Sequence, residues 1–274
     1  MPCFDSCREA ASMTNPKRIR RAIIPAAGKG TRLLPLTKAI PKELIPLGRK
    51  PVLEHIISEC KLCGIEEIVL VVSAEKEAIR RHFGDCFEGV KFSYAYQAEP
   101  IGLADAIRCG KDWVGNEPFA VVLGDSVIES GQDTLPLRRV LDAFETTDAA
   151  AVILVQPTPR VELFRYGVVK PKSGVGPKFE IDDIVEKPRP EDAPSIYAVA
   201  GRYAFEPSIF DYIDRTSRGA GNEYQISDSI RIMLNDGLPV WCVALGSDEV
   251  RRDIGTFETY FEAFAVELAK EKRL

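Results

Sequence analysis

A cationic loop rich in glycine is the first stretch of this sequence that could carry chemistry. The run AAGKGTR, residues 26–32, contains Lys29 and Arg32, and Lys38 and Lys42 follow it closely. Glycine has no side chain, so backbone N–H groups in such a loop can approach phosphate oxygens closely. These clustered cations suit the several negative charges of a nucleoside triphosphate. The loop therefore predicts a phosphate-binding site.

Two familiar phosphate-binding loops do not match this run. The dinucleotide fingerprint G-x-G-x-x-G requires a glycine where the chain has Leu33, and the P-loop spacing G-x-x-x-x-G-K-[ST] is missing. Pro35 also prevents a helix from starting at once and continuing cleanly. No clear ribose-binding acid follows the second predicted strand. An NAD-binding Rossmann enzyme is accordingly disfavoured.

Two polar side chains stand at the ends of predicted strands. Asp125 follows the apolar run VVLG, and a carboxylate at the carboxyl end of a buried strand suits a Mg2+ ligand. Gln97 ends the strand FSYAYQ. Its amide can both donate and accept hydrogen bonds. Ligands of open α/β sheets bind at the carboxyl ends of the strands, where both residues would lie.

The elements that must position these residues alternate between strand and helix. Continuous apolar strands between amphipathic helices predict an α/β, Rossmann-like fold, whose mostly parallel mixed sheet is flanked by helices. The predicted strands are 20–26, 67–73, 92–97, 119–124 and 150–155, and the predicted helices are 51–64, 75–83, 103–113 and 135–144.

The pattern changes after about residue 156. Pro/Gly-rich stretches at 156–160, 171–177 and 188–194 separate short alternating segments, which predict a smaller antiparallel β elaboration. A helix near 225–234, a strand at 240–245 and a final helix at 256–272 complete the chain. We expect a flexible tail over 1–18 and one domain over 19–274. Its halves, 19–156 and 157–274, would bind the nucleotide and the second substrate, and the second half also carries the C-terminal helix.

Charge and composition exclude several classes of protein. The 274 residues carry a net charge of −5 and are 45% hydrophobic, which is ordinary for a globular chain. An acidic body argues against general nucleic-acid binding, and no apolar run approaches the ~18 residues of a membrane span. The N-terminal stretch has no apolar core, so we expect no secretory signal, no membrane partner and a cytoplasmic location.

The cysteines are expected to be free thiols that bind no metal. There are 7 of them, an odd number, which favours free thiols in a reducing compartment. Cys60 and Cys63 form a C-x-x-C pair late in a predicted helix, but a zinc site would need a second pair of ligands. We therefore expect these two side chains to be buried or half-buried thiols.

An ordered set of motifs resembles the sugar-1-phosphate nucleotidylyltransferase family. A-A-G-x-G-T-R-L-x-P-x-T-K is followed by P-K-E-L, and the form TKAIPKEL (37–44) is typical of the bacterial UTP–glucose-1-phosphate uridylyltransferase (UDP-glucose pyrophosphorylase) branch. The later blocks are Gln97-x4-Gly102, Leu123-Gly-Asp125, Tyr166-Gly-Val-Val, Val185-Glu-Lys-Pro188, Asn222-Glu-Tyr-Gln-Ile-Ser-Asp228 and Asp253-Ile-Gly-Thr256. The resemblance spans nearly the whole chain, from about Lys17 onward.

The resemblance implies a reaction and a set of roles. UTP and glucose 1-phosphate would give UDP-glucose and pyrophosphate, with Mg2+ as cofactor and a homodimer or homotetramer as the assembly. Arg32, Lys42 and Asp125 would be catalytic, and Asp125 and Asp253 would hold the metal. The nucleotide would contact Ala27, Gly28, Lys29, Gly30, Gln97 and Gly102, and the sugar phosphate would contact Gly167, Glu186 and Lys187.

Two alternatives stay open at this point. The segments LGDS (123–126) and DIGT (253–256) lean toward glucose-1-phosphate thymidylyltransferases that use dTTP. The link between Phe83 and Phe92 is also too short for the helical insertion that bacterial uridylyltransferases commonly carry. Uracil and thymine differ by one methyl group, which is worth only about 1–3 kcal/mol in a pocket. The other alternative is a non-catalytic regulatory subunit that binds a sugar nucleotide. Such a protein should have lost Arg32, Lys42 or Asp125, and all three are present.

Overall fold

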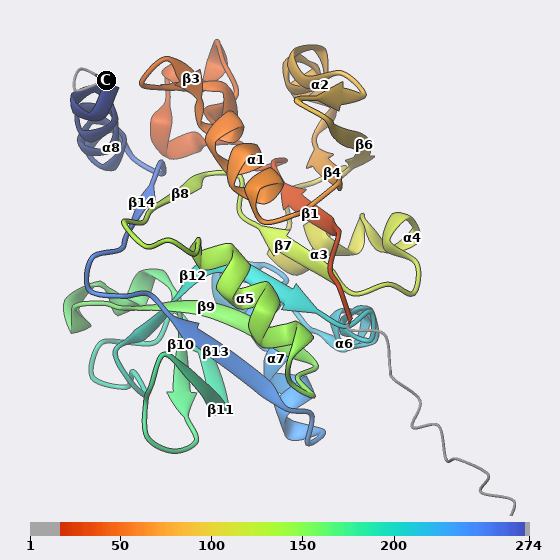
Figure 1. Ribbon diagram of the computed structural model, residues 1–274, viewed down its shortest axis with the longest axis vertical. Coiled ribbons are helices and arrows are strands. Elements are labelled where there is room, and N and C mark those ends of the chain that lie inside the picture. Colours follow the sequence, from red (N-terminus) through yellow and green to blue (C-terminus); the bar gives the residue numbers. More distant parts are fainter. Residues whose placement is uncertain (1–16, 272–274) are drawn as a thin grey trace, which may run out of the picture.

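A ten-stranded mixed sheet runs through residues 17–271, the part of the chain that the computed structural model describes (Figure 1). The predicted tail over 1–18 lies outside the described residues, except for its last two. The strands lie in the order β10 (Gly167–Pro171), β11 (Lys178–Glu186), β13 (Val240–Ala244), β9 (Ala151–Pro157), β12 (Tyr197–Phe205), β7 (Phe119–Val122), β1 (Arg21–Pro25), β4 (Glu67–Val72), β6 (Val90–Tyr96) and β5 (Cys86–Phe87).

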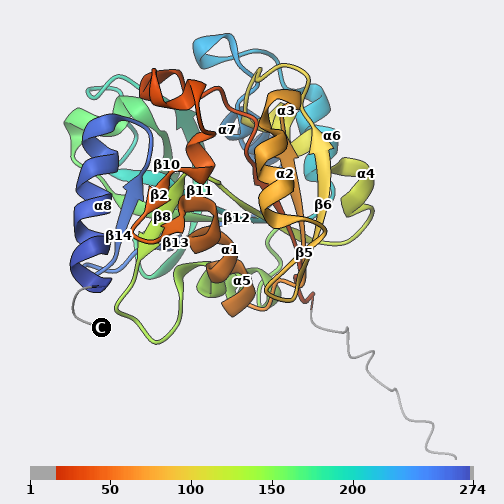
Figure 2. The same ribbon diagram turned by 90° about the horizontal axis from the view of Figure 1, so that it is seen from above.

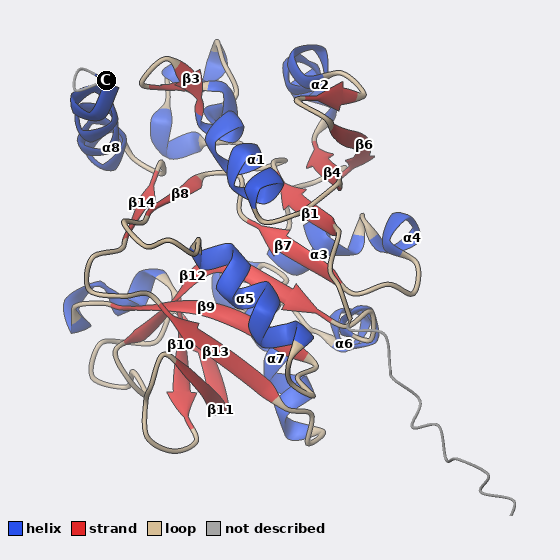
Figure 3. Cartoon of the chain, in the orientation of Figure 1, coloured by secondary structure: helices blue, strands red, loops and turns tan. Residues whose placement is uncertain are grey.

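Strand direction divides this sheet into two parts. β7, β1, β4 and β6 are parallel to one another, as the alternation of strand and helix predicts. β12 then pairs antiparallel with both β7 and β9, and β11 pairs antiparallel with β10 and β13. The α/β fold and its antiparallel elaboration are thus confirmed. The two parts form one continuous sheet, because β12 hydrogen-bonds to both of them (Figure 3).

The strands bury side chains on both faces, which explains their continuous apolar character. Along β1 and β4, Ile24 and Leu70 face one hydrophobic cluster, whereas Ile23 and Val69 face the other. Successive side chains of a strand point to opposite faces, so one apolar strand supplies both cores. The first cluster is covered by α1 (Val52–Leu62), α2 (Glu77–Phe83) and α5 (Pro136–Glu145), and the second by α3 (Leu103–Arg108), α4 (Lys111–Val114), α6 (Ile209–Arg215) and α7 (Ile226–Asn235).

Three local features differ from the predicted elements. The helix expected over 103–113 is divided into α3 and α4, because Gly110, a poor helix former, packs directly against Ile23. The helix α6 was not expected. β7 ends at Val122, so Asp125 follows the strand through a turn instead of continuing it.

A two-stranded ribbon outside the main sheet joins distant parts of the chain. β8 (Ser126–Glu129) pairs antiparallel with β14 (Val250–Asp253), and Asp253 lies opposite Ser126. The backbone N–H of Ile254 donates to the carbonyl of Asp125 at 2.9 Å. The two carboxylate-bearing segments are therefore neighbours, although more than a hundred residues separate them.

The C-terminal helix α8 (Phe257–Glu271) follows this ribbon and lies at one edge of the molecule, away from α4 (Figure 2). The hydroxyl of Tyr260 in α8 donates to the carbonyl of Pro46 at 3.0 Å. Pro46 belongs to a short hairpin of β2 (Pro46–Leu47) and β3 (Lys50–Pro51). Among the described residues, no helix combines the length and the apolar character that crossing a membrane requires.

The core predicts a matched pair of stability effects. Phe144 in α5 is fully buried, so Phe144→Ala should lower the free energy of unfolding by about 3–5 kcal/mol. Phe261 in α8 is 61% exposed, so Phe261→Ala should change it by about 0.5 kcal/mol or less. Chemical denaturation of both variants checks the pair, and equal losses would contradict the assignment of the core.

Candidate active site

Two adjoining cavities lie at the carboxyl ends of the central strands. The loop cavity, of about 550 Å³, is lined by the glycine-rich loop together with Gln97 and Gly102. The sheet cavity, of about 510 Å³, is lined by residues of β10–β12 and of the β8–β14 ribbon. Arg32, Leu123 and Asp125 line both cavities. The two volumes together could hold a nucleotide and a second substrate, since ligand cavities commonly measure about 300–1,000 Å³.

An ion pair lies where the two cavities meet. Lys42 Nζ lies 2.5 Å from Asp125 Oδ2. Burial alone would lower the pKa of Lys42, but the carboxylates of Asp125 and Glu43 outweigh it and raise this pKa above its usual value. Burial alone would raise the pKa of Asp125, but Lys42, Arg251 and Arg32 hold it below its usual value. Both groups are therefore charged at neutral pH.

A second ion pair lies beneath the glycine-rich loop. Lys76 Nζ donates to both carboxylate oxygens of Glu43, at 2.8 and 2.7 Å, and to the carbonyl of Ala26 at 2.7 Å. Glu43 follows Lys42 in the chain, and Ala26 begins the glycine-rich run. Burial raises the pKa of Glu43 and lowers the pKa of Lys76, against their mutual attraction. Lys76 thus ties the segment that carries Lys42 to the loop.

Two cations of the loop cavity have no partner among the described residues. Neither Lys29 nor Arg32 makes a hydrogen bond or an ion pair with the residues that the structure describes, and both are exposed. A methyl group placed on Gly255 would lie 3.5 Å from a nitrogen of Arg32, so the guanidinium rests against that glycine. These unpaired donors are suited to a ligand that carries several negative charges.

Gln97 is held in one orientation at the wall of the loop cavity. Its amide nitrogen donates to Asp105 Oδ2 at 2.8 Å and to the carbonyl of Gly102 at 3.2 Å. The side chain is 3% exposed. The sequence predicted an amide free to donate and accept, but Asp105 and Gly102 already accept from its NH2 group. The carbonyl oxygen of Gln97 is the atom left to accept a hydrogen bond.

Two of the predicted glycines lie where a neighbouring segment packs closely against them. Gly102 has φ +131°, and a Cβ there would lie 2.3 Å from the carbonyl oxygen of Tyr224. A Cβ on Gly167 would lie 2.7 Å from the hydroxyl of Ser227 and 3.0 Å from Glu186 Oε2. The backbone contact at Gly102 excludes any side chain, whereas a side chain at Gly167 would displace Ser227 and Glu186. Gly102 thus packs against the backbone of another segment, and Gly167 packs against side chains of the sheet cavity.

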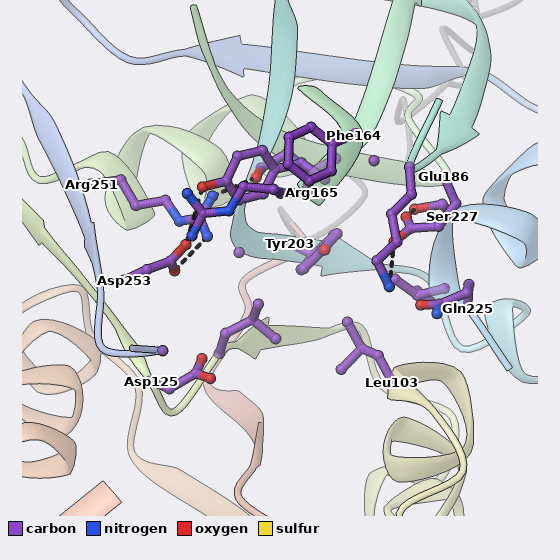
Figure 4. Close-up of a pocket in the computed structure, with 18 of the residues that line it drawn as sticks. Leu103, Asp125, Phe164, Arg165, Glu186, Tyr203, Gln225, Ser227, Arg251 and Asp253 are labelled. Atoms are coloured by element: carbon purple, nitrogen blue, oxygen red, sulfur yellow. Dashed lines mark hydrogen bonds and ion pairs between the residues drawn. The ribbon is translucent and has the colours of Figure 1, made fainter. Parts of the chain in front are cut away.

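A largely buried carboxylate, that of Glu186, lies on the far side of the sheet cavity. Ser227 Oγ donates to Glu186 Oε2 at 2.7 Å, and Lys187 Nζ lies 3.6 Å from Glu186 Oε1. Burial raises the pKa of Glu186, although Ser227 and Lys187 oppose the shift. Figure 4 shows Glu186 and Ser227 across the cavity from Asp125 and Asp253. The cavity therefore has carboxylates on two opposite sides, Glu186 on one and Asp125 and Asp253 on the other.

The structure brings the predicted site residues together. All six residues predicted for the nucleotide line the loop cavity, as does Lys42. Asp253 and the three residues predicted for the sugar phosphate line the sheet cavity. Arg32 and Asp125 lie where the cavities join. Their roles toward a ligand stay predictions.

Comparison with known proteins identifies the family of this chain. Residues 21–270 match the family model described as nucleotidyl transferase. This chain belongs to the nucleotidyl transferase family.

Relatives within the family are similar over most of the chain. A UTP–glucose-1-phosphate uridylyltransferase of Staphylococcus epidermidis is 42% identical over 239 residues, covering 79% of this chain and 82% of that protein. The protein of the same name from Staphylococcus haemolyticus is 40% identical over 261 residues, covering 87% and 88%. A crystal structure of UDP-glucose pyrophosphorylase complexed with UDP-glucose superposes with a TM-score of 0.86 at 32% identity, covering 92% of this chain and 99% of that one.

Several residues of this nucleotidyl transferase site escaped the sequence analysis. Lys76 sits in the charged run AEKEAIRR, which resembles a solvated helix start. Arg251 is two residues before Asp253, a spacing that places both on one face of a strand. Tyr203, 3% exposed, belongs to an apolar strand and lines the sheet cavity. Of these three residues, only Arg251 could have been found from the sequence, by its spacing of two from Asp253. That spacing is informative only if VRRD is known to be a strand.

The C-x-x-C pair of this nucleotidyl transferase is structural, as expected. Cys60 and Cys63 are 0% and 1% exposed in and just after α1. Burial raises the pKa of the Cys60 thiol well above its usual value and that of Cys63 to about 12. Both thiols are protonated at neutral pH and are poor nucleophiles and ligands.

The pair beneath the loop predicts a stability cycle. Lys76→Met leaves the Glu43 carboxylate buried without its partner, so the free energy of unfolding should fall by about 3–5 kcal/mol. The double variant Glu43→Met/Lys76→Met removes the uncompensated charge and should recover more than half of that loss. Chemical denaturation of the two single variants and the double variant measures the cycle. Additive losses in the double variant would show that the two charges are not coupled.

Proposed function

We propose that this protein transfers a uridylyl group from UTP to glucose 1-phosphate, giving UDP-glucose and pyrophosphate. One observation carries the proposal. Cations without a partner among the described residues, a paired lysine and aspartate, and a largely buried carboxylate with a neighbouring lysine line two joined cavities. Relatives of 42% and 40% identity are named for this reaction, and their similarity covers 79% and 87% of this chain.

The reaction needs two anions to approach each other. An oxygen of the sugar phosphate forms a bond to the α-phosphorus of UTP, and the bond from that phosphorus to the bridging oxygen of the β-phosphate breaks. Pyrophosphate leaves with the electron pair of the broken bond. Because the protein forms no covalent bond, its contribution is positioning and electrostatic stabilisation.

The cations of the loop cavity would hold the triphosphate. The unpaired guanidinium of Arg32 can bind two oxygens of the β- and γ-phosphates and stabilise the departing pyrophosphate. Lys42 would neutralise the α-phosphate and the attacking phosphate, for which its ammonium must exchange Asp125 for phosphate oxygens. Lys29 and the backbone of Ala27, Gly28 and Gly30 would complete the phosphate cradle.

Two carboxylates fit a divalent cation. Asp125 and Asp253 are oxygen donors on adjacent segments, and the described residues include no cluster of three or more metal-binding side chains. This donor set suits Mg2+, which usually takes one or two carboxylates and completes its octahedron with water and substrate phosphates. When bound, Mg2+ would neutralise charge on the reacting phosphates. Asp125 and Asp253 would supply its protein ligands.

The remaining predicted residues would select the base and the sugar. Gln97 presents only its carbonyl oxygen, which matches the N3–H donor of uracil, with Gly102 flanking the base. Glu186, fixed by Ser227, would accept hydrogen bonds from sugar hydroxyls. Lys187 would pair with the sugar's phosphate, and the backbone N–H of Gly167 would reach the sugar. The hydroxyl of Tyr203 faces the sheet cavity and adds a further partner (Figure 4). Assembly as a homodimer or homotetramer stays a prediction.

A substrate grid tests the proposed reaction. Pyrophosphate release is measured with UTP, dTTP, ATP and GTP, each against glucose 1-phosphate and other hexose 1-phosphates. We expect release with UTP and glucose 1-phosphate to exceed every other combination. Brisk release with dTTP and none with UTP would move the protein to the thymidylyltransferases. Binding of UDP-glucose without turnover in any combination would favour a regulatory subunit.

The metal ligands predict a loss of turnover without a loss of fold. Asp125→Asn keeps the volume of the side chain but removes the charge at the junction of the cavities. Because a bound metal supplies several kcal/mol of charge stabilisation, kcat should fall on the order of a thousandfold. Steady-state kinetics measures the loss, and circular dichroism checks the fold. Near-normal activity would exclude Asp125 from the site.

A further inference from the structure

One face of the β8–β14 ribbon carries a connected polar network. Side chains alternate along a strand, so Arg251 and Asp253 of β14 share a face, and Ser126 lies opposite Asp253 on the same face. The other face carries Arg252, whose Nε lies 2.6 Å from Glu129 Oε1. The ribbon therefore presents two neighbouring arginines in opposite directions.

The guanidinium of Arg251 has a protein acceptor at each of its three nitrogens. Nε donates to Ser126 Oγ at 3.0 Å, Nη1 donates to the carbonyl of Val199 at 3.0 Å, and Nη2 lies 2.5 Å from Asp253 Oδ1. The side chain is 7% exposed. An arginine held at all three nitrogens has one orientation, and it fixes the carboxylate that it contacts.

Tyr166 completes the setting of the Asp253 carboxylate. Its ring lies under the guanidinium of Arg251, with 4.7 Å from ring centroid to Cζ. Its hydroxyl donates to the other carboxylate oxygen, Asp253 Oδ2, at 3.4 Å. Figure 4 shows Arg251 beside Asp253 at the edge of the cavity, with Asp125 on the same side. Both oxygens of Asp253 are thus positioned, one by Arg251 of the same strand and the other by Tyr166 of a distant segment.

The same network reaches Asp125 through its neighbour. Ser126 is fully buried and follows Asp125 in the chain. Its hydroxyl accepts from Arg251, and its carbonyl accepts from Arg202 Nη2 at 2.8 Å. Arg202 is itself fully buried and paired with Glu59 of α1 at 2.7 Å. Two arginines therefore hold the residue next to Asp125, Arg251 at its hydroxyl and Arg202 at its carbonyl.

We propose that Arg251 is a positioning residue that holds Asp253, and through Ser126 the Asp125 segment, so that both carboxylates face one divalent cation. The inference rests on the proposed function, because it assigns a partner to the proposed metal ligands. Arg251 acts through these residues and not by binding phosphate, because its nitrogens already have protein acceptors and its side chain is nearly inaccessible. Residues that orient metal ligands in this way typically contribute about 10- to 100-fold to metal affinity.

The test measures metal binding in the absence of turnover. Mn2+ is titrated into the whole protein with α,β-methylene-UTP, whose carbon bridge prevents transfer, and free Mn2+ is followed by electron paramagnetic resonance. Arg251→Met should raise the apparent Kd for Mn2+ by about 10- to 100-fold. The Mg2+ concentration that gives half the maximal rate should rise in parallel. Arg252→Met removes the neighbouring guanidinium on the opposite face and should leave both values unchanged.

A double-mutant cycle separates positioning from an independent effect. If Arg251 acts through Asp253, then Arg251→Met should add little to the loss caused by Asp253→Asn alone. Thermal unfolding of each variant establishes that it is folded. If Arg251→Met does not fold, Ser126→Ala takes its place, because it removes only the hydroxyl that accepts from Arg251. It should weaken Mn2+ binding in the same direction but less strongly.

The outcomes distinguish failure of the inference from failure of the proposed function. If Asp125→Asn and Asp253→Asn weaken Mn2+ binding but Arg251→Met and Ser126→Ala do not, the positioning role is wrong and the metal site stands. The positioning role is also wrong if Arg251→Met weakens Mn2+ binding by the same factor whether or not Asp253→Asn is present. A rise in the KM for glucose 1-phosphate with unchanged metal affinity would contradict it as well. If neither aspartate variant changes Mn2+ binding, the proposed metal site is itself wrong.

Discussion

The placement of charge in a partly buried cleft is the constraint on which the rest of this structure depends. A buried charge without a partner carries a large desolvation cost, so charges here are met by neighbours of opposite sign. Lys42 pairs with Asp125, Lys76 with Glu43, and Arg251 with Asp253. The loop cations Lys29 and Arg32 lie at the exposed rim, where water solvates them. They can remain unpaired there and available to an anion.

The sheet makes this arrangement possible by bringing two parts of the chain to one edge. β12 runs antiparallel between β7 and β9, so the antiparallel part continues the parallel part without a linker. The glycine-rich loop after β1 and the turn after β7 therefore face β10 and β11 across a single cleft. The β8–β14 ribbon then adds Asp253 beside Asp125. A ligand spanning the two cavities would touch both halves of the chain at once.

The reaction type of the nucleotidyl transferase family explains why so many charged side chains of the cleft are held in place. A protein that joins two phosphorylated substrates must hold like charges close together, and fixed side chains do this with little reorganisation. The contacts beneath the cavities serve that end. Lys76 ties the Lys42 segment to the loop, Ser227 fixes Glu186, and Arg202 and Arg251 hold Ser126. Most of these supporting side chains are buried and make several polar contacts.

The sequence alone determined the fold class, the glycine-rich loop and part of the lining of the two cavities, because apolar periodicity and motif spacing are local properties. Only the tertiary structure decided which charges pair. Lys76 lies 33 residues from Glu43, and Arg251 lies 125 residues from Ser126, so no local pattern joins them. The tertiary structure also shows that the amide nitrogen of Gln97 donates to Asp105, and that residue 102 must be glycine because it packs against the backbone of Tyr224. These contacts depend on which strands and loops pack against each other, and local sequence patterns do not specify that packing.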